Sequence, residues 1–353
     1  MTHKQKVQLG VGFALAAGLL AWFLHGQNWA EIGNAFGRAK LGYLAGLIVW
    51  TVIAYVVRAW RWGYLYRPLA RVPFKDLLSA TYIGFMSALL VPRSGEVLRP
   101  YLIARRHPVS TSSGFATVIL ERLIDLITVL TLFALYLYIL PPPAEERPEL
   151  MELYLPLIGP LAVRGLAGFA ILSLLAICLG FLFWADRAMK IADWVFGRLP
   201  TRIGAPLAHM GHSFGQGLAI LNAPASLLAA IFGQSLLLWL SIAIGFHFNN
   251  LAFDIVLPFH STFLLIAFLT VGVAVPTPGS VGGFHVAYQI AMRCYGVSAA
   301  EGTAAGISAH ALTNLPVLVI GLLFLAGEGL TMGKVAELAG GEAEAPGAPE
   351  GKR

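Results

Sequence analysis

Charged residues are scarce in this chain. Lys, Arg, Asp and Glu together make up 12% of its 353 residues, which is about half the share found in a soluble domain. Hydrophobic residues make up 58% of the chain, and the mean hydropathy is +0.74. A soluble fold could not bury this much apolar surface, so lipid must solvate a large part of the protein. The composition therefore excludes a soluble globular domain and predicts an all-α integral membrane protein.

Cysteine is rare, and the motifs of common enzymes are missing. Cys178 and Cys294 lie far apart in apolar surroundings, which gives no metal-ligand spacing and no disulfide framework. The sequence contains no nucleophile elbow, no HExxH motif and no Walker loop. We therefore predict no catalytic residues, no metal site and no cofactor, and we expect that the protein is not an enzyme.

The few charges are mostly basic, and the formal net charge is +6. The excess Lys and Arg residues lie beside apolar runs, where they mark the cytoplasmic side of a membrane protein. We therefore expect no nucleic-acid partner. The pattern favours a bacterial-type cytoplasmic (inner) membrane, with both termini in the cytoplasm.

Apolar runs near or above about 18 residues predict membrane spans. Six such runs occur, at residues 9–24, 41–57, 124–140, 166–184, 227–246 and 303–326. The membrane domain is expected to cover residues 1–330. The tail at 331–353 is rich in Gly, Ala, Glu and Pro, so we expect it to be disordered.

Two further apolar segments are interrupted by proline and glycine. The first is residues 77–91, which meets a break at residues 92–96, and the second is residues 259–275, which meets a break at residues 276–280. Non-helical backbone at membrane depth is tolerated only where it is buried in protein or lines a wet cavity. The sequence therefore predicts about six transmembrane helices plus two re-entrant broken hairpins.

The two breaks resemble each other, since residues 88–95 align with residues 272–279. The predicted halves, at about 41–140 and 227–327, are linked by residues 141–226 and run in opposite senses. This is the pattern of an inverted-topology repeat. Paired interrupted segments of this kind mark a midplane binding site in transporters.

The candidate substrate-binding residues are the polar and turn residues at the expected membrane depth. They are Arg93, Gly95, Glu96, Arg99, Glu121, Arg122, Asp125, Pro276, Pro278, Gly279, Gly282, His285, His310 and Asn314. Ionisable groups at this depth cost about 2.5–3.5 kcal/mol each on insertion scales, so they usually pair or face water.

An anion is the ligand that these residues favour. A half-helix that begins near Gly95 or Gly279 would present free N–H groups and a positive dipole end. Arg93 and Arg99 would add bidentate donors for phosphate oxygens.

Other interpretations of the charges stay open. Glu96, Glu121 and Asp125 could hold the arginines in a purely structural network or carry a coupling proton. His285 and His310 suit either proton transfer or packing. Arg58 and Arg61, which alternate with Trp60 and Trp62, are interpreted as anchors at the cytoplasmic interface.

Three segments, 92–99, 121–125 and 276–282, together resemble the transmembrane region of lysylphosphatidylglycerol synthases. This region also occurs alone in flippase-like membrane proteins, and the likeness covers about residues 8–330. The resemblance implies a stand-alone lipid-translocation protein, because the aminoacyltransferase domain of the full synthases is not in this sequence. Ser280 stands where the family often has glycine, and His285 stands where it often has glutamate.

Two functions follow as hypotheses. The first is a lipid flippase or transporter that moves a lipid with an anionic headgroup, of phospholipid, polyprenyl or hopanoid type, across the cytoplasmic membrane. Its partners would be membrane lipids. The second is a non-transporting scaffold or accessory subunit for a lipid-modifying enzyme or glycosyltransferase. The sequence leaves the oligomeric state open.

Overall fold

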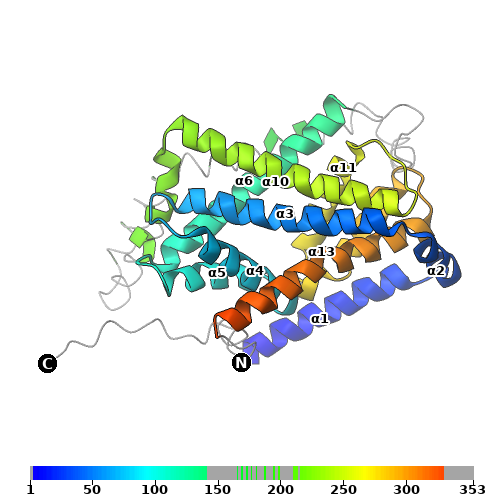
Figure 1. The fold of residues 1–353 in the computed structure, drawn as a ribbon, viewed down its shortest axis with the longest axis horizontal. Coiled ribbons are helices and arrows are strands. Elements are labelled where there is room, and N and C mark those ends of the chain that lie inside the picture. The colour runs from blue at the N-terminus through cyan, green and yellow to red at the C-terminus, as the bar shows by residue number, and fades with distance from the viewer. Residues whose placement is uncertain are drawn as a thin grey trace.

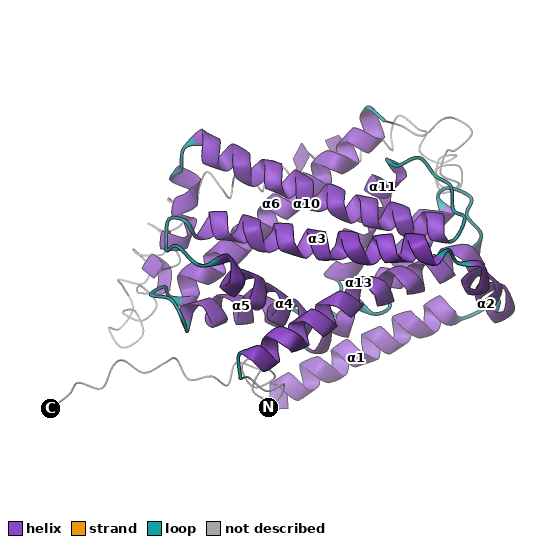
Figure 2. Cartoon of the chain, in the orientation of Figure 1, coloured by secondary structure: helices purple, strands orange, loops and turns teal. Residues whose placement is uncertain are grey.

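The computed structural model describes residues 3–140, 210–213 and 215–329, with a few scattered residues between 165 and 198. Within these residues every regular element is a helix and no strand occurs (Figure 2). The predicted all-α class is therefore confirmed. Most of the predicted linker 141–226 and all of the predicted tail 331–353 lie outside the described residues.

Within residues 3–140 and within residues 215–329, the described helices follow one another with short connections. They are α1 (His3–Leu24), α2 (Trp29–Arg38), α3 (Leu41–Tyr66), α4 (Phe74–Leu90), α5 (Ser94–Ala104), α6 (Thr111–Tyr138), η2 (Leu218–Asn222), α10 (Ala225–Ala252), α11 (Ser261–Ala274), η3 (Pro278–Ser280), α12 (Gly283–Arg293) and α13 (Ala299–Gly327).

Three of the described helices, α3, α10 and α13, are long and apolar enough to cross a bilayer. The protein is therefore a multi-pass helical membrane protein. Helix α6 is as long as α10, with 28 residues each, but it carries Glu121, Arg122 and Asp125 near its middle.

Helices α3 and α10 lie side by side and run in opposite directions (Figure 1). Small residues allow this close approach. A Cβ atom at Gly245 would lie 3.3 Å from Cδ1 of Leu47, and one at Gly46 would lie 3.0 Å from the ring of Phe248. Small residues serve the same purpose wherever membrane helices pack closely.

The chain breaks between helices at both positions that the sequence predicts. Helix α4 ends at Leu90 and α5 begins at Ser94, with Arg93 between them in a left-handed conformation (φ 62°). After α11, the turn η3 holds Gly279 at φ 59°, and Gly282 at φ 85° precedes α12. Non-glycine residues rarely adopt positive φ, so Arg93 marks a tightly determined turn.

In each broken hairpin, two glycines allow the two helices to pack closely. A Cβ atom at Gly95 would collide with the carbonyl oxygen of Gly84, and one at Gly283 would collide with that of Gly272. The two helices of each pair therefore touch along their backbones, which only glycine permits.

The two broken pairs approach from different ends of the molecule. In Figure 1, α4 and α5 lie near the C-terminal end of α3, whereas α11 starts near the opposite end of the molecule. Their turns meet, because α4 packs against η3 and Nη2 of Arg93 donates to the carbonyl oxygen of Ala274 at 3.4 Å.

Buried apolar side chains form two large clusters in the described part of the chain. One joins α3, α4, α5 and the first half of α6 with η2, the start of α10 and the second half of α13. The other joins the second half of α6 with α10, α11, α12 and the start of α13. The charged residues of α6 lie at the junction of the two clusters, since Ile124 belongs to the first and Val129 to the second.

Candidate functional site

Six charged side chains form one cluster at the junction of the two apolar cores. Glu121 and Asp125 lie one turn apart on α6 and are 0% and 5% exposed. Four arginines surround them, and we call these six residues the ion cluster. The arginines are Arg58 and Arg61 from α3, Arg99 from α5, and Arg122 from α6. The ion cluster thus combines four positive charges with two negative charges.

Glu121 is held chiefly by Arg99. Nη1 and Nη2 of Arg99 donate to the two carboxylate oxygens at 3.1 and 3.0 Å, the bidentate geometry that makes such pairs strong. The guanidinium of Arg99 also stacks over the ring of Trp62 at 4.1 Å, and Nε1 of Trp62 donates to Thr117. This carboxylate is therefore a structural partner that orients Arg99.

Asp125 is held by side chains from two other helices, α3 and α10. Its Oδ1 lies 2.7 Å from Nη1 of Arg61 and accepts from Nε1 of Trp239 on α10 at 3.0 Å. Its Oδ2 accepts from Nη1 of Arg58 at 3.2 Å. Arg61 also donates to Ser235 of α10 at 2.6 Å. These contacts tie α3, α6 and α10 together at the level of the ion cluster.

The interpretation of Arg58 and Arg61 as interface anchors is wrong. Their side chains are 10% and 0% exposed and belong to the ion cluster. They lie three residues apart on α3, on the same face as Trp62 and Leu65, which are also buried. The sequence did not indicate this burial, because both arginines follow the predicted apolar run 41–57, whereas α3 continues to Tyr66 in the structure.

A cavity of about 410 Å³ lies beside the ion cluster. One part of its wall is basic and is formed by Arg58, Arg99 and Arg122. The side chain of Arg122 is 40% exposed, and its contacts with Glu121 and Asp125 are long, at 3.5 and 3.8 Å. Arg122 is therefore the arginine of the ion cluster that is most available to a ligand.

A second part of the cavity wall is polar and carries no acidic side chain among the described residues. It is formed by His310, Thr313 and Asn314 of α13 and by Gly279 and Ser280 of the second turn. The rest of the lining is largely apolar, and both hairpin turns reach it. A concave site of this kind, with a few converging polar groups, is the usual form of a ligand pocket.

The two histidines beside the second turn contact each other. Their ring centroids are 4.6 Å apart. His310 Nε2 lies 2.7 Å from the carbonyl oxygen of Gly279, and Nδ1 of His285 accepts from the backbone N–H of Gly282 at 3.4 Å. The pair therefore holds the shape of the turn, and of the two only His310 lines the cavity.

Comparison with known proteins places this chain in a family. Residues 9–321 match the family described as the lysylphosphatidylglycerol synthase TM region. The chain belongs to this family. A glycosyltransferase named AglD from Haloferax volcanii is 28% identical over 127 residues, which cover 35% of this chain and 20% of AglD. The similarity to AglD is therefore confined to a fifth of that protein.

In this member of the lysylphosphatidylglycerol synthase TM family, the structure brings most of the predicted site residues to one place. Those that line the cavity are Arg93, Gly95, Glu96, Arg99, Arg122, Gly279, His310 and Asn314. Glu121 and Asp125 lie behind the arginines. Pro276, Pro278, Gly282 and His285 are not among the lining residues.

One local expectation for this family member is wrong. Helix α5 begins at Ser94, next to Gly95 as predicted, but α12 begins at Gly283, four residues after Gly279. Gly279 lies instead in η3, a short 3-10 turn of three residues. The positive φ angles at Gly279, Ser280 and Gly282 delay the helix. The second turn therefore lines the cavity with backbone of irregular conformation, and no helix begins at Gly279.

Residues outside the prediction also reach the site. Trp239 and Phe85 line the cavity, and the guanidinium of Arg58 lies 5.1 Å from the centroid of the Phe85 ring. Thr313 lines the cavity one residue before Asn314. Of these three residues, Thr313 carried a signal, because it is a polar residue on an apolar span.

Proposed function

We propose that this protein translocates a lipid with an anionic headgroup across the cytoplasmic membrane. The headgroup would occupy the cavity between the two hairpin turns while the acyl chains stay in the bilayer. The observation that carries the proposal is the basic wall of Arg58, Arg99 and Arg122 on a cavity inside a multi-pass membrane protein. Arginines at membrane depth are costly and usually mark a substrate pathway.

The proposal includes a topology of six spans and two re-entrant hairpins in an inverted repeat. The helix bounds support it. Helices α6 and α13 begin 188 positions apart, at Thr111 and Ala299. Each follows a serine N-cap that accepts a hydrogen bond from the backbone N–H three residues on.

The glycine contacts support the same register. Gly84 and Gly95 are eleven residues apart, as are Gly272 and Gly283, and the two pairs are again 188 positions apart. This register differs by four residues from the alignment of the two prolines at Pro92 and Pro276. Backbone contacts are the better guide because they fix where the two helices of a hairpin cross.

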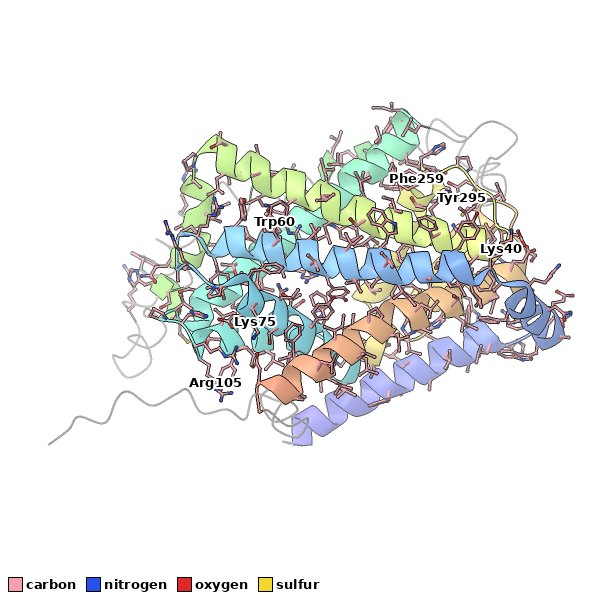
Figure 3. The ribbon with its side chains drawn as sticks, in the orientation of Figure 1. Lys40, Trp60, Lys75, Arg105, Phe259 and Tyr295 are labelled. Atoms are coloured by element: carbon pink, nitrogen blue, oxygen red, sulfur yellow. The ribbon has the colours of Figure 1, made fainter. Side chains whose placement is uncertain are left out.

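Charge supports an orientation with α5 and the end of α3 in the cytoplasm. Five basic residues lie at this end, at Arg67, Arg71, Lys75, Arg105 and Arg106. Lys75 and Arg105 can be seen at one end of Figure 3, and Lys40 lies at the other. At the Lys40 end the described acidic and basic residues are balanced, so the positive-inside rule favours the first end as cytoplasmic.

Transport can be tested in proteoliposomes that contain fluorescent phosphatidylglycerol, with loss of signal on addition of an external quencher as the readout. We expect lipid exchange well above that of protein-free liposomes. Arg122→Gln should lower the rate about tenfold, the order of one charge-assisted hydrogen bond. Arg105→Gln is the matched control, because Arg105 is exposed and does not line the cavity. Wild-type protein that equals protein-free liposomes for every anionic lipid would refute the proposal.

A second candidate is an accessory subunit of a glycosyltransferase. The similarity to part of AglD favours it. It predicts that an enzyme co-purifies with the protein, and that Arg122→Gln leaves both this association and lipid modification in cells unchanged. If Arg122→Gln abolishes lipid exchange in liposomes that contain no other protein, the accessory role is not needed to explain the site.

A further inference from the structure

The charges around the cavity do not balance. The ion cluster contains four arginines and two carboxylates. Arg93 and Glu96 on the first turn also line the cavity, and they add one charge of each sign. The site as a whole therefore carries two positive charges more than negative ones. Buried charge without a partner is costly, so such a site favours a ligand that supplies the missing charge.

The two carboxylates of the ion cluster are already saturated. Glu121 lies within 4 Å of all four arginines. Asp125 contacts Arg58 and Arg61 and accepts a further hydrogen bond from Trp239. Neither carboxylate has capacity left for the surplus donors that face the cavity.

Unpartnered N–H groups also occur on Arg61 and Arg99, but among the arginines that line the cavity Arg58 and Arg122 have the fewest hydrogen bonds from their terminal Nη atoms. Among the described residues, Arg58 donates hydrogen bonds through Nη1 alone, although a guanidinium has five N–H donors. Arg122 donates one long hydrogen bond of 3.5 Å. Both side chains line the cavity, and their guanidinium groups flank the Phe85 ring, at 5.1 and 5.7 Å from its centroid.

The second part of the cavity wall supplies no compensating acid. Its polar residues are His310, Thr313 and Asn314, and Glu96 is the single acidic residue among those described as lining the cavity. Hydroxyl, amide and imidazole groups can bind phosphate oxygens, but they do not neutralise the arginines. The neutralising charge must come from the ligand.

We infer that the site takes a doubly charged phosphate headgroup, that is, a phosphomonoester or a diphosphate, in preference to a singly charged phosphodiester. Two arginines with free donors match the several terminal oxygens of such a group. This inference rests on the proposed lipid transport and narrows its substrate class.

The opening of the cavity suits a lipid that carries this headgroup. Arg93 and Val273 line the cavity and are also exposed, Val273 to 42%. Ala88 and Leu89 line the cavity beside them. A hydrocarbon tail can therefore leave between the two turns along apolar side chains while the phosphate stays near the arginines.

The test compares fluorescent lipids that share their acyl chains and differ in headgroup charge. Proteoliposomes at pH 8 receive phosphatidic acid, phosphatidylglycerol or phosphatidylcholine. We expect phosphatidic acid to exchange at least about tenfold faster than phosphatidylglycerol, and phosphatidylcholine to match protein-free liposomes. Arg122→Gln should bring the first two rates together, and Arg122→Lys should keep them apart, because it retains the charge.

The outcomes separate this inference from the function on which it rests. Equal exchange of phosphatidic acid and phosphatidylglycerol would overturn the preference for two charges and leave lipid transport standing. Exchange of phosphatidylcholine as fast as the others would show unselective scrambling and overturn the inference. No exchange of any lipid would refute the proposed function itself. Uptake of radiolabelled inorganic phosphate without lipid exchange would show that the site takes free phosphate.

Discussion

The four arginines of the ion cluster differ in how much of their side chain is committed to the fold. Arg99 and Arg61 are buried completely. Their shortest ion pairs are with Glu121 and Asp125, respectively. Arg122 is 40% exposed and has long contacts. We therefore propose that Arg61 and Arg99 mainly stabilise the fold and that Arg122 mainly binds the ligand. Arg58 contacts both carboxylates and lines the cavity, so we propose that it has both roles.

Glu121→Gln tests the structural part of this assignment. The change would leave the four arginines of the ion cluster around one carboxylate, and breaking a buried pair such as Arg99 with Glu121 typically costs about 3–5 kcal/mol. We expect a loss of that size in the free energy of unfolding, measured by denaturant titration in detergent. Asp254→Asn is the control, because its ion pair with Lys40 is exposed and water screens such pairs. Equal losses for the two variants would contradict the assignment.

At the scale of the helical elements, the two glycine contacts determine how the broken hairpins form. Gly95 meets Gly84, and Gly283 meets Gly272, where no side chain could fit. Each contact lies in the first turn of the second helix of its hairpin. The contacts therefore set the position of the turn relative to the cavity.

Gly95→Ala and Gly283→Ala should each destabilise the protein by about 1–3 kcal/mol, because overpacking forces the backbones apart. Both variants should also lose lipid exchange. Gly33→Ala on α2 is the matched control, since a Cβ atom there meets nothing within 4 Å and alanine favours a helix over glycine. Thermal unfolding in detergent would measure all three, and an unchanged Gly95→Ala would argue against the backbone contact.

Arg106 links three elements at the predicted cytoplasmic end. Its Nη1 lies 3.2 Å from Asp76 near the start of α4 and 3.2 Å from Glu328 just after α13. Glu328 also accepts from Ser79. These contacts hold both ends of the first hairpin against α13, although each is partly exposed and individually weak.

Arg106→Gln should loosen the first hairpin without unfolding the protein. We expect faster amide hydrogen exchange in α5 and little change in the thermal midpoint, since local opening costs less than global unfolding. The neighbouring Arg105→Gln is the control, because Arg105 forms no ion pair with the described residues. Identical exchange in the two variants would mean that the link does not restrain α5.

At the scale of the whole molecule, helices that correspond in the proposed repeat run in opposite directions. Figure 1 shows this for α3 with α10 and for α6 with α13. The two hairpins consequently reach the centre from opposite ends. The turns of both hairpins therefore line one cavity, but they differ in chemistry. The first turn contributes the charged residues Arg93 and Glu96, and the second contributes Gly279 and Ser280.

Single cysteines test the orientation that this arrangement implies. In a chain with Cys178→Ala and Cys294→Ala, we place a cysteine at Arg105 or at Val256, which is 79% exposed between α10 and α11. An impermeant maleimide should label the Val256→Cys protein in intact cells. It should label the Arg105→Cys protein only after the membrane is permeabilised. The reverse pattern would invert the proposed topology.

The helix breaks were predictable, but their register was not. Proline and glycine at 92–96 and 276–280 limit helix wherever they occur. The start of α12 at Gly283 depends instead on its contact with Gly272. That contact involves residues on two different helices, so it cannot be predicted from the local helix propensity of either segment.

The sequence alone determined the class of the protein. Composition and the lengths of apolar runs reflect the solvent around a chain, and both require lipid here. The tertiary structure alone decided which charges meet. Arg58 and Arg61 reach Glu121 and Asp125, 60 or more positions away, because α3, α6 and α10 pack around the junction of the two cores. Such pairings arise from helix packing, which composition and local pattern do not encode.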